Sequence, residues 1–172
     1  KNLNINGLVF DPFVGSGTTL LAARKNGLKS IGFDVNPISA LVSTVANETY
    51  SKEDIISLRK EIELLQQLRK CNKNYHTAFE LAEKVFNSDI LQSLLQIKEH
   101  IEHIANERAK NVFFVAWLSI IESVSNIKKE GNGIKYKNRK RTPKGYITID
   151  KKKWEASVFP QDKFYFVQTK LL

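Results

Sequence analysis

The alternation of apolar and polar positions predicts a short β-α-β-α unit at the start of the chain. Residues 8–10 form a continuous apolar run, as a buried parallel strand would, and residues 30–33 are predicted to form a second short strand. Residues 18–25 between them have helical character, and Pro37 is suited to the first turn of a further helix. We therefore expect residues 1–50 to form a parallel α/β unit.

From Ser51 onward the apolar spacing becomes that of helices. Ser51 and Asp54 resemble a capping box, and strand patterns are missing from the sequence that follows. Because a doubly wound sheet would normally return to strands after two such units, residues 51–128 are predicted to be a helical insertion or lid. The expected helices start at Ser51 and then cover about residues 76–86, 88–109 and 111–128.

Residues 129–172 are predicted to be a basic, loop-rich segment with short strands at about 146–149 and 159–167. Residues 128–153 hold eleven basic and two acidic side chains, so this window carries the whole formal net charge of +9. A localised basic stretch beside a neutral body is typical of a protein that binds a polyanion. The alternative is a solvated, flexible loop.

Six basic residues of this window are the candidate nucleic-acid contacts. Tyr136, Tyr146 and Trp154 are interleaved with them, as in segments that combine phosphate contacts with base stacking, although each could instead anchor a loop to the core. The six candidates are Lys135, Lys137, Arg139, Lys140, Arg141 and Lys144.

Composition narrows the class of protein. The chain has 172 residues, 42% of them hydrophobic, which suffices for a core, and it has no apolar run of about eighteen residues. We therefore expect a soluble protein with no membrane partner. A single cysteine, Cys71, fits a reducing cytoplasm, and the sequence has no metal-binding pattern, so no bound metal is expected. The chain starts at Lys1 and has no Met, so we expect a fragment of a longer protein.

The most informative string, DPFVGSGTT at residues 11–19, ends the first strand and opens the next helix. A phosphate-binding Walker loop requires Gly-Lys-Ser/Thr, but Thr18 follows Gly17. A dinucleotide site requires a third glycine where Leu20 stands, and it would place Asp11 against a pyrophosphate. A simple tight turn would explain the glycines but not the aspartate, serine and threonines together.

S-adenosylmethionine fits this string better, because its amino acid end and sulfonium are cationic and it has no phosphate to repel Asp11. DPFVGSGTT resembles the first cofactor motif of DNA amino-methyltransferases of restriction-modification type, and the resemblance continues through GFDVNP at residues 32–37. Asp34 follows Asp11 by 23 residues, close to the separation that places a carboxylate on the ribose in Rossmann-like folds. Its alternative role is to cap the next helix.

The resemblance implies a Rossmann-like methyltransferase fold of the α/β class, here with an incomplete sheet and a large helical insertion. It implies that Asp11 and residues 15–17 surround the methionine moiety, that Phe13 packs near the adenine and that Asp34 accepts from the ribose. The implied cofactor-binding residues are Asp11, Pro12, Phe13, Gly15, Ser16, Gly17, Thr18, Asp34 and Asn36.

The family's catalytic motif is Asp, Asn or Ser followed by Pro-Pro and an aromatic residue. The prolines are Pro12, Pro37, Pro143 and Pro160, so no two are adjacent and no catalytic residue is assigned. We therefore expect this chain to supply the cofactor part of an enzyme that methylates adenine or cytosine in DNA, and to be inactive alone. The alternatives are an RNA base methyltransferase, or a non-catalytic subunit that depends on a partner.

Overall fold

The computed structural model describes residues 7–131 and 133–172, so the first six residues of the expected 1–50 unit lie outside it. The N-terminal part is a β-α-β-α unit, as predicted. The two strands are parallel, with Leu8 opposite Lys29 and Asp11 opposite Gly32. The elements are β1 (Leu8–Asp11), α1 (Thr18–Lys25), β2 (Lys29–Gly32) and α2 (Pro37–Asn47).

Four helices follow and form an elongated body. The predicted capping box is confirmed, because the Ser51 hydroxyl accepts from the Asp54 N–H while the Asp54 carboxylate accepts from the Ser51 N–H. The helices are α3 (Lys52–Gln67), α4 (Glu80–Val85), α5 (Ser88–Glu102) and α6 (Glu107–Val124).

The single helix expected over residues 88–109 is wrong, because the chain breaks between Glu102 and Glu107. The Asn106 side chain accepts from the Ala109 N–H and starts α6 there. Ile104, inside the break, is buried with the core. The apolar periodicity therefore continued across a helix boundary and concealed it.

The C-terminal segment contains two antiparallel hairpins and two helices. The strand expected over residues 159–167 is wrong, because α8 begins after Asp162, whose carboxylate accepts from the Tyr165 N–H. Phe164 and Val167 are buried three positions apart, which is helical rather than strand spacing. The elements are β3 (Ile127–Glu130), β4 (Gly133–Tyr136), β5 (Arg139–Thr142), β6 (Gly145–Thr148), α7 (Lys151–Val158) and α8 (Lys163–Leu171).

The hydrophobic core lies in the helical body and includes residues from the C-terminal helices. Phe159 and Val167 belong to the same buried cluster as Ile90, Ile97 and Val124. The Gln168 amide donates to the carbonyl of Leu68 at 3.1 Å and also to that of Leu65. The chain after the hairpins thus returns to the body and closes its core.

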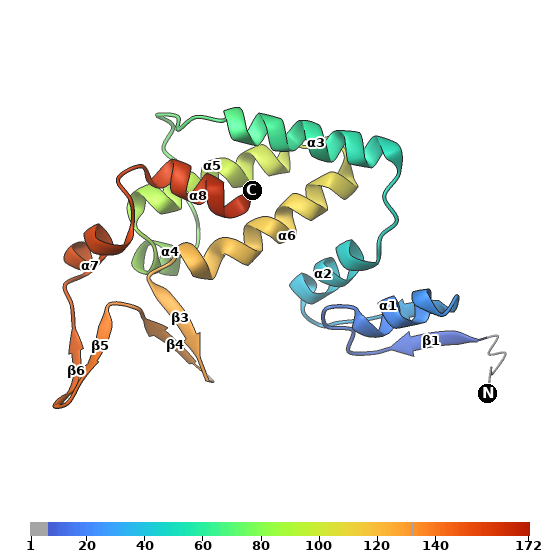
Figure 1. The fold of residues 1–172 in the computed structure, drawn as a ribbon, viewed down its shortest axis with the longest axis horizontal. Coiled ribbons are helices and arrows are strands. Elements are labelled where there is room, and N and C mark those ends of the chain that lie inside the picture. The colour runs from blue at the N-terminus through green and yellow to red at the C-terminus, as the bar shows by residue number, and fades with distance from the viewer. Residues whose placement is uncertain (1–6, 132) are drawn as a thin grey trace.

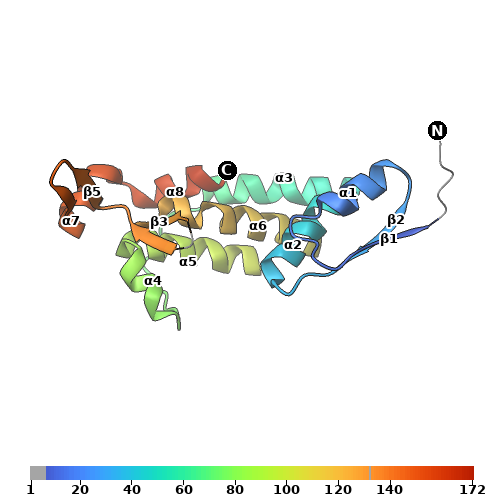
Figure 2. The same cartoon turned by 90° about the horizontal axis from the view of Figure 1, so that it is seen from below.

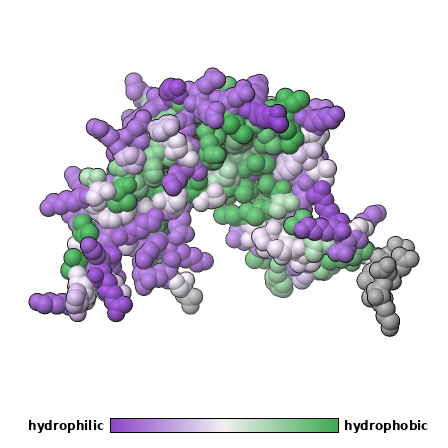
Figure 3. Space-filling model, in the orientation of Figure 1, coloured by the Kyte–Doolittle hydropathy of each residue, from purple (hydrophilic) through white to green (hydrophobic). Residues whose placement is uncertain are grey.

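The molecule is an arch. The β-α-β-α unit lies at one end of the helical body and the hairpins at the other, and Figure 1 shows both projecting from the same side. The view from below agrees that the body separates them (Figure 2). The space-filling view shows the molecule hollowed between the two ends (Figure 3).

The mixed α/β class is confirmed by the described elements. The parallel sheet has two strands within residues 7–131 and 133–172, so a Rossmann-like sheet stays a prediction. Within the described residues, no helix has both the length and the apolar character needed to span a bilayer.

Candidate functional site

The loop between β1 and α1, residues 12–17, is called the glycine loop. One backbone hydrogen bond ties it to the residue after β2, and another closes the loop on itself. The Val14 N–H donates to the carbonyl of Phe33 at 2.8 Å, and the Gly17 N–H donates to the carbonyl of Val14 at 2.8 Å. Gly15 and Gly17 both have positive φ, at 51° and 85°. Side-chain-bearing residues rarely adopt this conformation, which explains why glycine stands at both positions.

Asp34 clamps this loop to the start of α2. One carboxylate oxygen accepts from the Gly15 N–H at 2.9 Å, and the other accepts from the Asn36 N–H at 2.8 Å. A carboxylate offers about four acceptor positions, so these two bonds leave room for further donors. Asp34 therefore orders the chain just before α2, although Asn36 and not Asp34 is the residue that caps this helix, and the role of Asp34 at the ribose stays a prediction.

Gly17 packs directly against α2, which the sequence did not reveal. A Cβ at Gly17 would lie 2.6 Å from the Ser43 hydroxyl and 2.5 Å from the Asn47 amide nitrogen. The Asn47 amide donates to the carbonyl of Gly17 at 3.2 Å. The available sign in the sequence was that Ser43 and Asn47 stand four positions apart and so lie on one face of the helix.

The outer surface of the loop is open. A Cβ at Gly15 would have only the Phe13 carbonyl within 4 Å, at 4.0 Å. The Phe13 side chain is 80% exposed. Hydrogen bonds from the Thr19 hydroxyl and the Phe13 N–H hold the pKa of Asp11 below its ordinary value, so the strand ends in a stable negative charge.

The other predicted cofactor residues lie around the same loop. Pro12, Ser16 and Thr18 are exposed on it, and Thr18 is the first residue of α1. Asn36 is also exposed, and its side chain accepts from the Ile38 N–H at 3.0 Å and so caps α2. The structure thus brings all nine predicted residues together at the carboxyl ends of β1 and β2.

The two-stranded sheet presents a large apolar surface to solvent. Leu8, Phe10 and Phe33 are 58%, 59% and 60% exposed, and the rings of Phe10 and Phe33 lie 5.8 Å apart. A parallel sheet is normally covered on both faces. This surface therefore has the character of one that another part of a protein covers.

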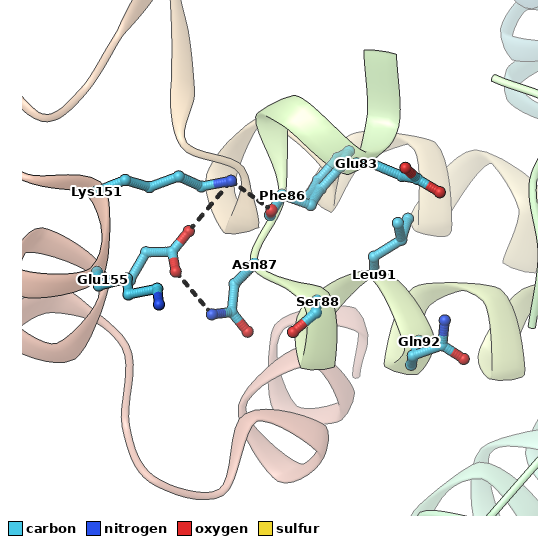
Figure 4. A pocket seen from close by; sticks show the side chains of 9 residues that line it. Glu83, Phe86, Asn87, Ser88, Leu91, Gln92, Lys151 and Glu155 are labelled. Atoms are coloured by element: carbon cyan, nitrogen blue, oxygen red, sulfur yellow. Dashed lines mark hydrogen bonds and ion pairs between the residues drawn. The ribbon is translucent and has the colours of Figure 1, made fainter. Parts of the chain in front are cut away.

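Two lysines of the basic segment are used inside the fold. The Lys137 ammonium donates to the carbonyls of Glu122 and Ser125 at 2.7 and 2.9 Å, at the end of α6. Burial lowers the pKa of Lys137. Lys151 donates to the carbonyl of Phe86 and lies 3.7 Å from the Glu155 carboxylate, as Figure 4 shows.

The remaining candidate cations are exposed on the hairpins. Lys135 pairs with Glu130 at 3.1 Å. Arg139, Lys140, Arg141 and Lys144 have no acidic partner within residues 7–131 and 133–172. A pocket of about 490 Å³ lies at the base of β5–β6. It is lined by Lys84, Asn126, Tyr136, Asn138, Arg139, Thr148, Lys151 and Trp154.

The three aromatic residues of the segment differ in setting. Tyr136 and Tyr146 are 47% and 60% exposed. Trp154 is half-buried and packs edge-on against Phe159, with ring centroids 5.6 Å apart. In the described ranges, no group of three or more His, Cys, Asp or Glu side chains is placed to hold a metal ion.

Comparisons with known proteins point to one family. A family model described as DNA methylase matches residues 2–43, the segment that contains the glycine loop and Asp34. The Type II methyltransferase M.MjaII of Methanocaldococcus jannaschii is 35% identical over 75 residues, which cover 43% of this chain and 14% of that protein.

Two further relatives extend the similarity along the chain. M.BsoBI of Geobacillus stearothermophilus is 28% identical over 159 residues, covering 88% of this chain and 30% of that protein. M.MvaI of Kocuria varians is 26% identical over 127 residues, covering 69% and 28%. Both are Type II methyltransferases. The chain thus spans less than a third of the length of the curated relatives it matches.

No solved structure matches the chain. The family model nonetheless matches the residues that carry the glycine loop and the Asp34 clamp. The resemblance of residues 11–19 and 32–37 to DNA amino-methyltransferases of restriction-modification type is thereby confirmed.

Proposed function

We propose that this chain supplies the S-adenosylmethionine-binding part of an enzyme that methylates an exocyclic amino group of adenine or cytosine in DNA. The observation that carries the proposal is the clamp between Asp34 and Gly15, which lies inside the segment matched by the DNA methylase family model. This clamp fixes the glycine loop at the carboxyl ends of β1 and β2, and α/β sheets bind nucleosides at such strand ends.

The residues of the loop fit this cofactor. Asp11 keeps a negative charge that suits the cationic amino acid end, and Asp34 has acceptor positions left for the ribose hydroxyls. Phe13 presents an exposed ring that could pack on the adenine. The bound cofactor would supply the methyl group, and the chain's own residues would hold and orient it.

Calorimetry with S-adenosylmethionine, or with its demethylated product, tests the cofactor assignment. Asp34→Ala should weaken binding by about 1–3 kcal/mol, since a charged acceptor is lost. Because Asp34 also holds the loop, Phe13→Ala is the sharper variant. Because the Phe13 side chain is 80% exposed, the Phe13→Ala variant should lower the affinity for the cofactor without lowering the melting temperature.

The control for Phe13→Ala is Ile56→Ala, which removes a 66% exposed apolar side chain from α3. This control should leave both affinity and melting temperature unchanged. Binding that persists unaltered in Asp34→Ala and in Gly15→Val would refute the cofactor assignment.

Base capture and transfer are proposed to reside in another part of the methyltransferase or in a partner subunit. The exposed apolar surface of β1 and β2 and the greater length of the relatives support this division. Cofactor binding alone does not position a target nitrogen. We therefore expect no methyl transfer to duplex DNA by this chain, and a radiolabelled-methyl assay checks it.

DNA is the proposed partner of the exposed hairpin cations Lys135, Arg139, Lys140, Arg141 and Lys144. Lys137 is left out, because its ammonium is already bonded to the end of α6. The local excess of positive charge beside a neutral body supports phosphate contacts.

A further inference from the structure

The β5–β6 hairpin is an exposed two-stranded ribbon. Its register pairs Arg139 with Thr148 and Arg141 with Tyr146. Every residue of β6 is exposed, and so are the first three of β5. A lone hairpin gains little stability from burying its own side chains, so a surface of this kind is available for a partner.

Strand alternation sorts the side chains of the ribbon onto two faces. Arg139 and Arg141 lie on one face together with Tyr146 and Thr148. The Arg139 guanidinium lies 4.8 Å from the centre of the Tyr146 ring, which restricts its orientation. The opposite face carries Lys140, Thr142, Gly145 and Ile147. The two arginines therefore extend from a single face of the ribbon.

The major groove of B-DNA is about 12 Å wide and admits a two-stranded β-ribbon. An arginine guanidinium can donate two parallel hydrogen bonds to O6 and N7 of guanine, whereas a lysine ammonium acts as a point charge. We propose that the β5–β6 hairpin enters the major groove and that Arg139 and Arg141 read guanine bases there. This inference rests on the proposed DNA substrate.

Both ends of the ribbon are fixed to the body, which suits a reading element. At its base the Asn138 amide donates to the carbonyl of Ile149 at 2.7 Å, and the Ile149 N–H donates to the carbonyl of Asn138 at 2.9 Å. Before it, Lys137 is bonded to the end of α6. After it, the Glu155 carboxylate accepts from the Asn87 amide at 2.8 Å (Figure 4). Rigid supports of this kind lower the entropy lost on binding.

The position of the ribbon also fits base methylation. The hairpins and the glycine loop project from the same side of the helical body, with the hollow between them (Figures 1 and 3). A methyltransferase extrudes its target base from the duplex toward the cofactor. A reading element at one end of the hollow and a cofactor loop at the other could then act on the same stretch of DNA.

The test selects duplexes that bind this chain from a randomised DNA library and sequences them. The expected result is a motif that contains guanine. Exchanging that guanine for 7-deazaguanine removes N7 but keeps pairing and charge, so affinity should fall about 5- to 150-fold. The double variant Arg139→Lys and Arg141→Lys keeps the charge, and it should lose the preference for the motif by a similar factor.

The matched control is Arg59→Lys, an exposed arginine on α3, which should keep the motif. The inference is overturned by a motif that survives in the double variant, by binding without sequence preference, by no DNA binding, or by a motif found only with an RNA library. If the double variant does not fold, the 7-deazaguanine measurement on the unaltered chain decides alone. Cofactor calorimetry needs no DNA, so failure here is distinct from failure of the proposed function.

Discussion

The glycine loop and the β5–β6 hairpin show two different ways to present a surface to a ligand. The loop is defined by backbone: Gly15 and Gly17 have positive φ, and Asp34 fixes the Gly15 N–H at 2.9 Å. The hairpin is defined by side chains, since both its faces are exposed and its arginines extend from one of them. Substitutions of the loop glycines should therefore damage the fold, whereas substitutions of the exposed hairpin cations should alter only the interaction.

The strongest test of this difference is Gly17→Ala. The new Cβ would meet Ser43 and Asn47 at 2.6 and 2.5 Å, and φ is +85°. Backbone strain and overpacking should together lower the free energy of unfolding by about 2–5 kcal/mol. Urea titration measures this change.

Gly27→Ala is the matched control, because Gly27 has φ +71° but no atom within 4 Å of the added Cβ. It should cost only the strain, about 1–2 kcal/mol. Equal losses in the two variants would show that packing against α2 contributes nothing.

The second test neutralises the hairpin by changing Arg139, Lys140 and Arg141 to Gln. The unfolding free energy should stay within about 0.5 kcal/mol of that of the unaltered chain, since these side chains are exposed. The slope of log affinity for duplex DNA against log salt should become shallower by up to about 2.7, at about 0.9 for each lost contact.

The matched control changes the exposed residues Lys52, Arg59 and Lys60 to Gln and so removes the same charge from α3, a helix that lies away from the hairpins (Figure 1). It should leave the salt slope nearly unchanged. If the two triple variants alter the slope equally, net charge and not the hairpin governs binding.

A third test separates two cations within the basic segment. Lys137→Ala removes an ammonium bonded to the end of α6 and should destabilise the fold by about 1–2 kcal/mol. Lys140→Ala removes an exposed side chain and should be nearly neutral for stability. Chemical denaturation of both variants gives the comparison, and a neutral Lys137→Ala would contradict the capping role.

The smallest expected effect concerns Asp54 in α3, which accepts hydrogen bonds from Asn106 and Arg108 at the start of α6. Hydrogen bonds from Asn106 first, then from Ser51 and Arg108, lower the pKa of Asp54 to about 2 from 3.8. Its contribution to stability is therefore complete above about pH 4 and is lost as the pH falls toward 2. Melting curves between pH 2 and pH 5 should lose part of their acid dependence in Asp54→Asn, and an unchanged profile would count against this account.

Local rules in the sequence were sufficient for the glycine loop and for the starts of α1, α2, α3 and α5. Pro37, the Ser51–Asp54 capping box and the glycines of residues 15–17 each act within a few residues of the chain, so their effect could be predicted. The role of Asp34 was predicted less completely. Its position was expected, but its bond to the Gly15 N–H joins residues 19 positions apart.

The tertiary structure alone decided which cations stay exposed and where the chain closes its core. Lys137 and Lys140 each carry one positive charge, but of these two Lys137 contacts the carbonyls at the end of α6. The Lys137 N–H donates to the Asn126 carbonyl at 2.7 Å, and this bond holds Lys137 beside that helix end. Residues 159–167 could pair as a strand or pack as a helix, and the contacts of α8 with α5 and α6 selected the helix. Apolar spacing and charge counts are properties of one segment, whereas burial depends on which other segments fold against it.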